Sequence, residues 1–262
     1  MNATKIEEFH IEAPEGKIWV KKWTPEAASE KSPLVLLHDS LGSVALWREF
    51  PPRLAENLSR CVIAYDRLGF GRSDAREELP AKNFIEEEAT KYFPAIKEHL
   101  SLQRYVLLGH SVGGGMAIHI ASRDPGCEAV ITISAQAFIE DLTLRGIRAA
   151  QQVFEQPGQL ERLEKWHGNK ARWVLHAWTD TWLSAEFANW NLQDAIGRVY
   201  CPVLAFHGAN DEYGSSASPE FISRHSGGKG TMLLLKNCGH MPHREKTQEV
   251  ISAVKQFLKT VA

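Results

Sequence analysis

The 262-residue sequence lacks long hydrophobic runs. The longest are about six residues, far short of the roughly 20 that a membrane-spanning helix needs. It also lacks a strong charge of either sign, because its formal net charge is −2, whereas surfaces that bind nucleic acid or anionic membranes are rich in lysine and arginine. The first residues, MNATKIEE, lack the apolar core of a signal peptide. We therefore expect a cytoplasmic protein with no membrane span and no nucleic-acid partner.

Cysteine is scarce and scattered. The four cysteines are Cys61, Cys127, Cys201 and Cys238, and no pair has the C-x-x-C or Cys/His spacing of a zinc site. The histidines likewise fall on separate predicted loops without ligand spacing. The sequence thus predicts neither a disulfide framework nor a metal site.

Short apolar runs rich in valine, isoleucine and leucine recur from residue 34 onward. Continuous runs of this kind are typical of strands that are buried on both faces of a parallel sheet. They lie at 34–37, 62–65, 106–108, 130–133, 203–206 and 232–235. Apolar and polar residues alternate before Pro25, on both sides of a turn at 14–17, which predicts a β-hairpin at one edge of the sheet.

Amphipathic segments separate these runs, at about 44–58, 83–100, 112–123, 217–226 and 245–260. Alternation of strands and helices predicts an α/β fold, with a mostly parallel central sheet and helices on both faces. The stretch 136–197 breaks this rhythm, because it carries five of the eight tryptophans and several helical segments but no convincing strand. We expect residues 1–135 and 198–262 to form the core and residues 136–197 to form a helical cap, or lid.

Three residues that carry chemistry each follow one of the predicted strands. Ser111 comes after the run at 106–108, Asp211 after 203–206 and His240 after 232–235. The carboxyl ends of parallel strands meet at one edge of the sheet, where active sites of such folds lie. A serine hydroxyl attacks only when a histidine takes its proton, and a carboxylate orients that histidine. The sequence therefore predicts a catalytic triad of Ser111, Asp211 and His240.

The segment 109–113 reads Gly-His-Ser-Val-Gly, which fits the G-x-S-x-G pattern of a nucleophile elbow. A predicted strand precedes it and a predicted helix follows it, as the elbow requires. The flanking glycines allow the strand and the helix to pack closely around the serine. The N-terminus of the helix favours developing negative charge.

With this elbow the sequence resembles the α/β-hydrolase superfamily over nearly its whole length. The matching segments are 38–43, 66–73, 109–114 and 208–211, followed by Gly239-His240, Pro242-His243 and Glu245. The insertion at 136–197 stands where that family carries its helical cap. The resemblance implies the α/β-hydrolase fold and the triad, and it says little about the substrate.

Neighbouring residues offer alternatives to the triad members. The turn at 134–137 has no carboxylate, which favours Asp211 as the acid, and Glu212 is expected to point elsewhere. His243 is the alternative base, and we expect it to be a structural histidine at the start of the last helix. His38, His110 and His207 flank the site.

The backbone N–H groups of Val112 and Ser40 are expected to form the oxyanion hole. Position 39 is usually glycine in the family but is Asp39 here. We expect its carboxylate to face away and accept hydrogen bonds from turn N–H groups. The alternative is that it reaches the pocket and favours a cationic substrate. Arg67 and Arg72 belong to a structural turn, or else bind a carboxylate of the substrate.

These residues predict a serine hydrolase, carboxylesterase-like, that cleaves a small or medium carboxylic ester, lactone or related acyl compound through an acyl-Ser111 intermediate, without a cofactor. The expected pocket residues are Asp39, His110, Trp178, Trp182 and Met241. One alternative is hydrolysis of a carbon–carbon bond in aromatic ring-cleavage products, although such enzymes often carry tryptophan where Met241 stands. Another is a low-turnover ligand-binding or signalling protein. We expect a monomer or a homodimer.

Overall fold

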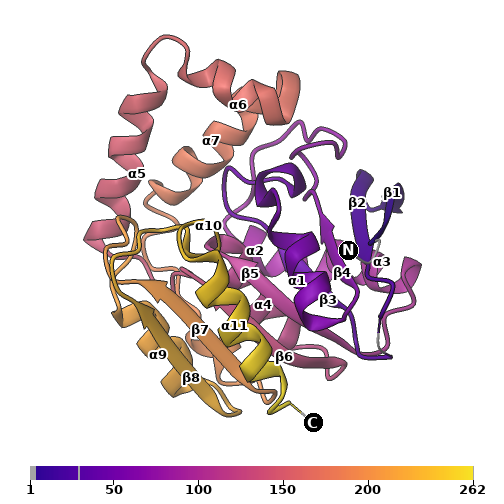
Figure 1. Ribbon diagram of the computed structural model, residues 1–262. Helices are drawn as coiled ribbons and strands as arrows, with labels where there is room; N and C mark the ends of the chain where they lie inside the picture. The colour runs from indigo at the N-terminus through magenta and orange to yellow at the C-terminus, as the bar shows by residue number, and fades with distance from the viewer. Residues whose placement is uncertain (1–3, 29, 262) are drawn as a thin grey trace.

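A computed structural model describes residues 4–28 and 30–261, and it consists of a central sheet with helices on both faces (Figure 1). The eight strands lie in the order β1-β2-β4-β3-β5-β6-β7-β8. Their bounds are β1 Lys5–Ala13, β2 Gly16–Thr24, β3 Leu34–Leu37, β4 Val62–Tyr65, β5 Tyr105–His110, β6 Cys127–Ile133, β7 Val203–Gly208 and β8 Gly230–Leu235. The strands from β4 to β8 in this order are parallel, and the β1–β2 hairpin is antiparallel. The predicted fold class is confirmed.

The inner strands are mostly apolar, since both of their faces are covered, and His110 and His207 lie near the carboxyl ends of β5 and β7. Every residue of β3, β4, β5 and β7 is buried. In β8, at one edge of the sheet, Leu235 is buried but its neighbours are partly exposed. The pairing places Leu36 beside Ala64 on one side and Leu108 on the other. Because these strands are parallel and in register, their carboxyl ends lie side by side, and the loops that follow them meet there.

Each face of the sheet has its own layer of helices and its own apolar core. One face packs against α1 and α11, through Leu54 and Val250. The other face packs against α3, α4 and α9, through Ile96, Ile118 and Ile222. The core helices and helical turns are η1 Val44–Trp47, α1 Phe50–Leu58, α2 Phe84–Glu87, η2 Glu88–Tyr92, α3 Phe93–His99, α4 Val112–Ala121, α9 Ala217–His225, α10 Pro242–Glu245 and α11 Thr247–Leu258.

The chain between β6 and β7 is helical and stands beyond one end of the sheet (Figure 1). Its elements are α5 Asp141–Phe154, α6 Gln159–His167, η3 Gly168–Lys170, α7 Ala171–Trp182 and α8 Gln193–Ile196. An isolated bridge between Phe138 and Asn191 joins the two ends of this helical segment.

His167, at the end of α6, attaches this helical segment to two loops of the core. Its Nδ1 accepts a hydrogen bond from the Gly71 N–H at 2.9 Å, and its Nε2 donates to the Leu41 carbonyl at 3.0 Å. Burial lowers the pKa of His167 to about 4. The imidazole is therefore neutral near pH 7, as this pair of hydrogen bonds requires. The loops after β3 and β4 are thus joined to the helices above them.

Among the described residues, no helix combines the length and the apolar character that crossing a membrane requires.

Candidate active site

Ser111 lies on a strained turn between β5 and α4. Its backbone angles are φ 53° and ψ −124°, which a residue other than glycine rarely adopts. A Cβ on Gly109 would lie 2.1 Å from the Gly113 carbonyl oxygen, and a Cβ on Gly113 would lie 2.2 Å from the Leu37 carbonyl oxygen. This tight turn therefore requires glycine at both positions, because any side chain there would collide with the backbone. Ser111 is only 7% exposed.

We expect Gly113→Ala to destabilise the protein by about 3 kcal/mol, because the added methyl group meets backbone atoms that cannot move independently. Gly115 in the same helix is a matched control, since a Cβ there would meet Ile85 Cγ2 at an ordinary 3.4 Å. Gly115→Ala should be neutral or stabilising by up to about 1 kcal/mol, because alanine favours the helix. Urea denaturation of the two variants measures this difference. Equal free energies of unfolding would contradict the account of the elbow.

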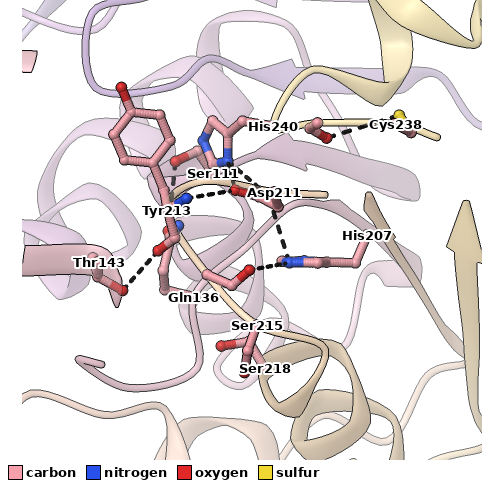
Figure 2. A network of polar contacts seen from close by, with 12 residues as sticks. Ser111, Gln136, Thr143, His207, Asp211, Tyr213, Ser215, Ser218, Cys238 and His240 are labelled. Carbon is pink, nitrogen blue, oxygen red and sulfur yellow. Dashed lines mark hydrogen bonds and ion pairs between the residues drawn. The ribbon is translucent and has the colours of Figure 1, made fainter. Parts of the chain in front are cut away.

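The Asp211 carboxylate binds the His240 imidazole. Both Asp211 oxygens lie 2.9 Å from His240 Nδ1, which leaves Nε2 free to face the reacting groups. The Tyr213 N–H donates to Asp211 Oδ1 at 2.8 Å, and His207 Nε2 lies 3.5 Å from Oδ2 while donating to the Gly214 carbonyl at 2.9 Å. Figure 2 shows Asp211 between the two histidines and Ser111 beside His240.

This arrangement sets the protonation of the pair. The Asp211 side chain is fully buried, and burial alone would raise its pKa, but the hydrogen bond and charge of His240 keep it below the ordinary value. Burial likewise opposes protonation of His240, whose side chain is 11% exposed. The hydrogen bond to Asp211 and the Asp211 charge outweigh burial, so the pKa of His240 is raised above 6.5. Asp211 thus stabilises the imidazolium that forms when His240 takes a proton.

Gln136 contacts the nucleophile, a role that the sequence did not predict. The Ser111 hydroxyl donates to Gln136 Oε1 over a long 3.5 Å, rather than to His240 (Figure 2). Gln136 follows β6 at the same edge of the sheet as the other site residues, so the rule that located Asp211 also applies to it. That turn was considered only as a source of a carboxylate.

The loop after β3 is held by its main chain. The Asp39 carbonyl accepts hydrogen bonds from His38 Nδ1 at 2.8 Å and from Arg67 Nη2 at 2.9 Å, and the Arg67 N–H donates to His38 Nε2 at 3.1 Å. In a trans peptide the C=O and the following N–H point in opposite directions. Fixing the Asp39 carbonyl therefore also fixes the Ser40 N–H, and Ser40 lines the cavity beside Ser111.

Arg67 and Arg72 are structural, as we expected. Arg67 is buried, and its guanidinium lies 4.0 Å from the Phe70 ring centroid. Arg72 pairs with Glu8 at 3.2 Å and covers the Trp19 ring. The alternative, in which these two arginines bind a carboxylate of the substrate, is not supported, because neither arginine lines the cavity that holds Ser111.

The expectation that the Asp39 carboxylate faces away is wrong. The side chain is 27% exposed and lines the cavity above Ser111, with Oδ1 3.6 Å from His110 Nδ1. Burial opposes its charge, but the neighbouring His110 imidazole, followed by His38 and His240, holds the pKa of Asp39 well below its usual range. Gly42 permits this position, since a Cβ there would meet Asp39 Oδ1.

The site opens into a cavity of about 200 Å³ between the core and the helical segment. Its lining brings together the residues predicted for the pocket with several that were not predicted. The predicted ones are Asp39, Ser40, His110, Ser111, Trp178, Trp182, His240 and Met241; the others are Leu41, Gln136, Thr143, Ile147, Glu212 and Tyr213. Glu212 lines the cavity, but Asp211 rather than Glu212 binds His240, as we expected. Val112 begins α4, so its N–H has no partner within the helix.

The remaining histidines near the site are packed among aromatic rings. His243 is buried, with its ring centroid 4.8 Å from that of Trp47 and 4.6 Å from that of His110. His110 Nε2 donates to the His240 carbonyl at 2.8 Å. His243 lies in the short helix α10 rather than at the start of α11. Among residues 4–28 and 30–261, no three His, Cys, Asp or Glu side chains are placed to hold a metal ion.

Residues 32–193 match the model of a family described as alpha/beta hydrolase fold. The chain is 28% identical over 269 residues to the proline iminopeptidase of Lactobacillus crispatus (strain ST1), with 88% of this chain and 91% of that protein covered. Its fold is similar to that of the 2-hydroxy-6-oxo-6-phenylhexa-2,4-dienoate hydrolase of Rhodococcus sp. strain RHA1, with a TM-score of 0.78, 18% identity and coverage of 98% and 100%. An esterase from Exiguobacterium antarcticum is similar too, with a TM-score of 0.75, 19% identity and coverage of 97% and 100%.

Proposed function

Because the chain belongs to the α/β-hydrolase family, we propose that it is a serine hydrolase that cleaves a small carboxylic ester, lactone or related acyl compound through an acyl-Ser111 intermediate. One observation carries the proposal. The Asp211–His240 pair stands beside Ser111, which occupies a strained elbow at the cavity wall. At about 200 Å³, the cavity is smaller than most ligand sites, which are about 300–1,000 Å³. This size favours short acyl chains.

In the proposed mechanism, the Ser111 hydroxyl turns from Gln136 toward His240 and attacks the substrate carbonyl while His240 Nε2 takes its proton. The N–H groups of Ser40 and Val112 stabilise the oxyanion, and helix α4 adds its N-terminal dipole. His240 then donates its proton to the leaving oxygen as the acyl C–O bond breaks. A water molecule, deprotonated by His240, releases the acid and restores Ser111. Residues 136–197 act as the cap that covers the substrate.

A panel of 4-nitrophenyl esters from acetyl to dodecanoyl tests this proposal. We expect steady multiple turnover, with the highest kcat/KM for acyl groups of a few carbons. A single burst that then stalls would instead support a low-turnover binding protein. Turnover that increases up to the dodecanoyl ester would contradict the assignment of the small cavity as the acyl site.

A second candidate function is cleavage of an amide next to an amine-bearing acyl group, and the charge of the cavity favours it. The charged side chains of its lining are the carboxylates of Asp39 and Glu212, and none of its lining residues is lysine or arginine. Such a wall attracts a positively charged substrate. The related iminopeptidase is named for action at proline, whose nitrogen is a secondary amine.

Asp39→Asn tests whether this wall selects for positive charge. We compare the prolyl and cyclopentanecarbonyl 4-nitrophenyl esters, which share a ring size and differ in charge, after subtracting spontaneous hydrolysis. The native protein should prefer the prolyl ester, and Asp39→Asn should reduce this preference by about fivefold, the effect of one partly exposed charge. If Asp39→Asn left the preference for the prolyl over the cyclopentanecarbonyl ester unchanged, Asp39 would not select for substrate charge. The same acyl groups as 4-nitroanilides compare amide with ester cleavage.

A further inference from the structure

A second cavity of about 300 Å³ adjoins the one that holds Ser111. The two share Asp39, Leu41 and Met241 in their walls. The second cavity extends under α6, where Leu163 and Trp166 provide an apolar and aromatic side. Nothing in the proposed mechanism uses this space, although Met241 directly follows the catalytic base His240.

The charge of the second cavity is opposite to that of the first. Arg162 on α6 and Arg244 on α10 both line it. Arg162 donates to Gln159 Oε1 at 3.2 Å, and Arg244 donates to Met241 Sδ at 3.4 Å. Among the residues that the structure describes, neither guanidinium has a carboxylate within 4 Å, although other exposed arginines such as Arg224 do. The two fixed cations are therefore available to a ligand.

Arg48 adds to this positive charge. Burial, and then the nearby Arg48 charge, lower the pKa of Arg244, while Asp39 acts in the opposite sense. The Asp39 carboxylate lies on the wall between the cavities, close to His110. The acidic first cavity and the second cavity with its two arginines thus share Asp39, an arrangement that suits a substrate with opposite charges at its two ends.

The mechanism indicates which end of the substrate belongs in the second cavity. His240 protonates the leaving oxygen, so the leaving group departs on the side of that histidine. Met241 and Arg244, which follow His240 in the chain, both line the second cavity. The acyl group remains bound to Ser111 in the first cavity, which contains Trp178 and Trp182.

We propose that the second cavity binds the leaving group, and that Arg162 and Arg244 select one that carries a negative charge, either a carboxylate or a phosphate. This inference rests on the proposed acyl-Ser111 chemistry. The substrate class is then a small ester or amide whose alcohol or amine portion is anionic.

Two acetate esters test the inference. 4-Acetoxybenzoate releases an anionic phenol, and its methyl ester releases a neutral phenol of nearly the same shape. We measure the ratio of their kcat/KM values in the native protein, in the double variant Arg162→Gln/Arg244→Gln, and in Arg172→Gln. Arg172 is an exposed arginine on α7 outside both cavities, so it is the matched control. Comparing ratios cancels the intrinsic difference in reactivity between the two esters.

We expect the ratio to fall about tenfold in the double variant and to stay unchanged in Arg172→Gln, since two partly exposed cations each contribute a few-fold. Added salt should reduce the native preference, because it screens exposed charges. In addition, calorimetry on Ser111→Ala with 4-hydroxybenzoate and with 4-hydroxyphenyl phosphate compares the two anions directly. Arginine-dependent binding of only one of them identifies which anion the site prefers.

The outcomes separate the two proposals. Equal ratios in all three proteins, with normal turnover of the neutral ester, would overturn the anionic subsite and leave the proposed function intact. Failure of folded native protein to cleave either ester would count against the proposed function. In that case calorimetry still tests the anionic subsite. Anion binding that is unaffected by the two arginine substitutions would overturn the proposed role of Arg162 and Arg244.

Discussion

Replacement of Ser111 by alanine is expected to lower kcat for 4-nitrophenyl acetate by at least about 10⁴-fold, because the acyl-enzyme can no longer form. Helix α4 and the elbow should remain folded, since alanine removes only a hydroxyl whose hydrogen bond to Gln136 is 3.5 Å long. Steady-state kinetics and a thermal denaturation curve measure the two properties on the same sample.

Ser122→Ala is a suitable control, because Ser122 directly follows α4 and its hydroxyl bonds to the His119 carbonyl away from the site. It should keep nearly all of the native activity. If Ser111→Ala retained more than about a hundredth of the native kcat, nucleophilic catalysis by Ser111 would be contradicted, because loss of a nucleophile normally costs far more.

Asp211→Asn is expected to reduce kcat by about 10⁴-fold while leaving the fold intact, since an amide can hold the imidazole in the wrong tautomer and cannot stabilise the imidazolium. The Asp211 side chain is fully buried and is shared by His240 and the Tyr213 N–H, so the change acts at the centre of the network. Asp194→Asn, at an exposed carboxylate on α8, is the control and should behave as the native protein does.

The pH dependence gives a second measurement on the same variant. Only neutral His240 accepts the serine proton, so native kcat/KM should rise with pH and reach half its maximum above 6.5, because the pKa of His240 is raised. Removing the Asp211 charge leaves burial as the main influence, which favours the neutral imidazole. The midpoint of Asp211→Asn should therefore move to lower pH. If the pH midpoint and the activity of Asp211→Asn were both native, Asp211 would neither orient His240 nor stabilise its protonated form.

The sequence predicted the parts of the site that depend on topology. Strands buried on both faces produce continuous apolar runs, and the residue after each run lies at the carboxyl edge of the sheet. Ser111, Asp211 and His240 each follow such a run, so their convergence required no knowledge of loop conformation. The same reasoning would have included Gln136, which follows β6, if uncharged side chains had been considered.

The positions of loop side chains could not be predicted in this way. Asp39 was expected to face away from the pocket, but its main-chain carbonyl is held by His38 and by Arg67, which lies 28 residues further along the chain. That distant contact turns the carboxylate toward His110. The local pattern likewise does not predict that Glu212, next to Asp211, lines the cavity.

The sequence also does not predict how the helices between residues 136 and 197 dock on the core. The sequence predicts helices between 136 and 197 and pocket positions for Trp178 and Trp182, and both tryptophans line the cavity. Trp173 is equally aromatic, but it packs against Phe70, and a Cβ on Gly69 would lie 2.5 Å from its ring. Which tryptophan faces the cavity depends on how the helices dock through His167, a contact made by partners far apart in the chain.

The most direct test of the central claim is to identify the residue that carries the acyl group. The protein is mixed with a fluorophosphonate and, in a separate sample, quenched during turnover of 4-nitrophenyl acetate, and both samples are digested and analysed by mass spectrometry. We expect one phosphonyl or acetyl adduct per chain, on Ser111, and none on Ser111→Ala. Steady turnover without any adduct on Ser111, or with an adduct on another residue, would contradict it.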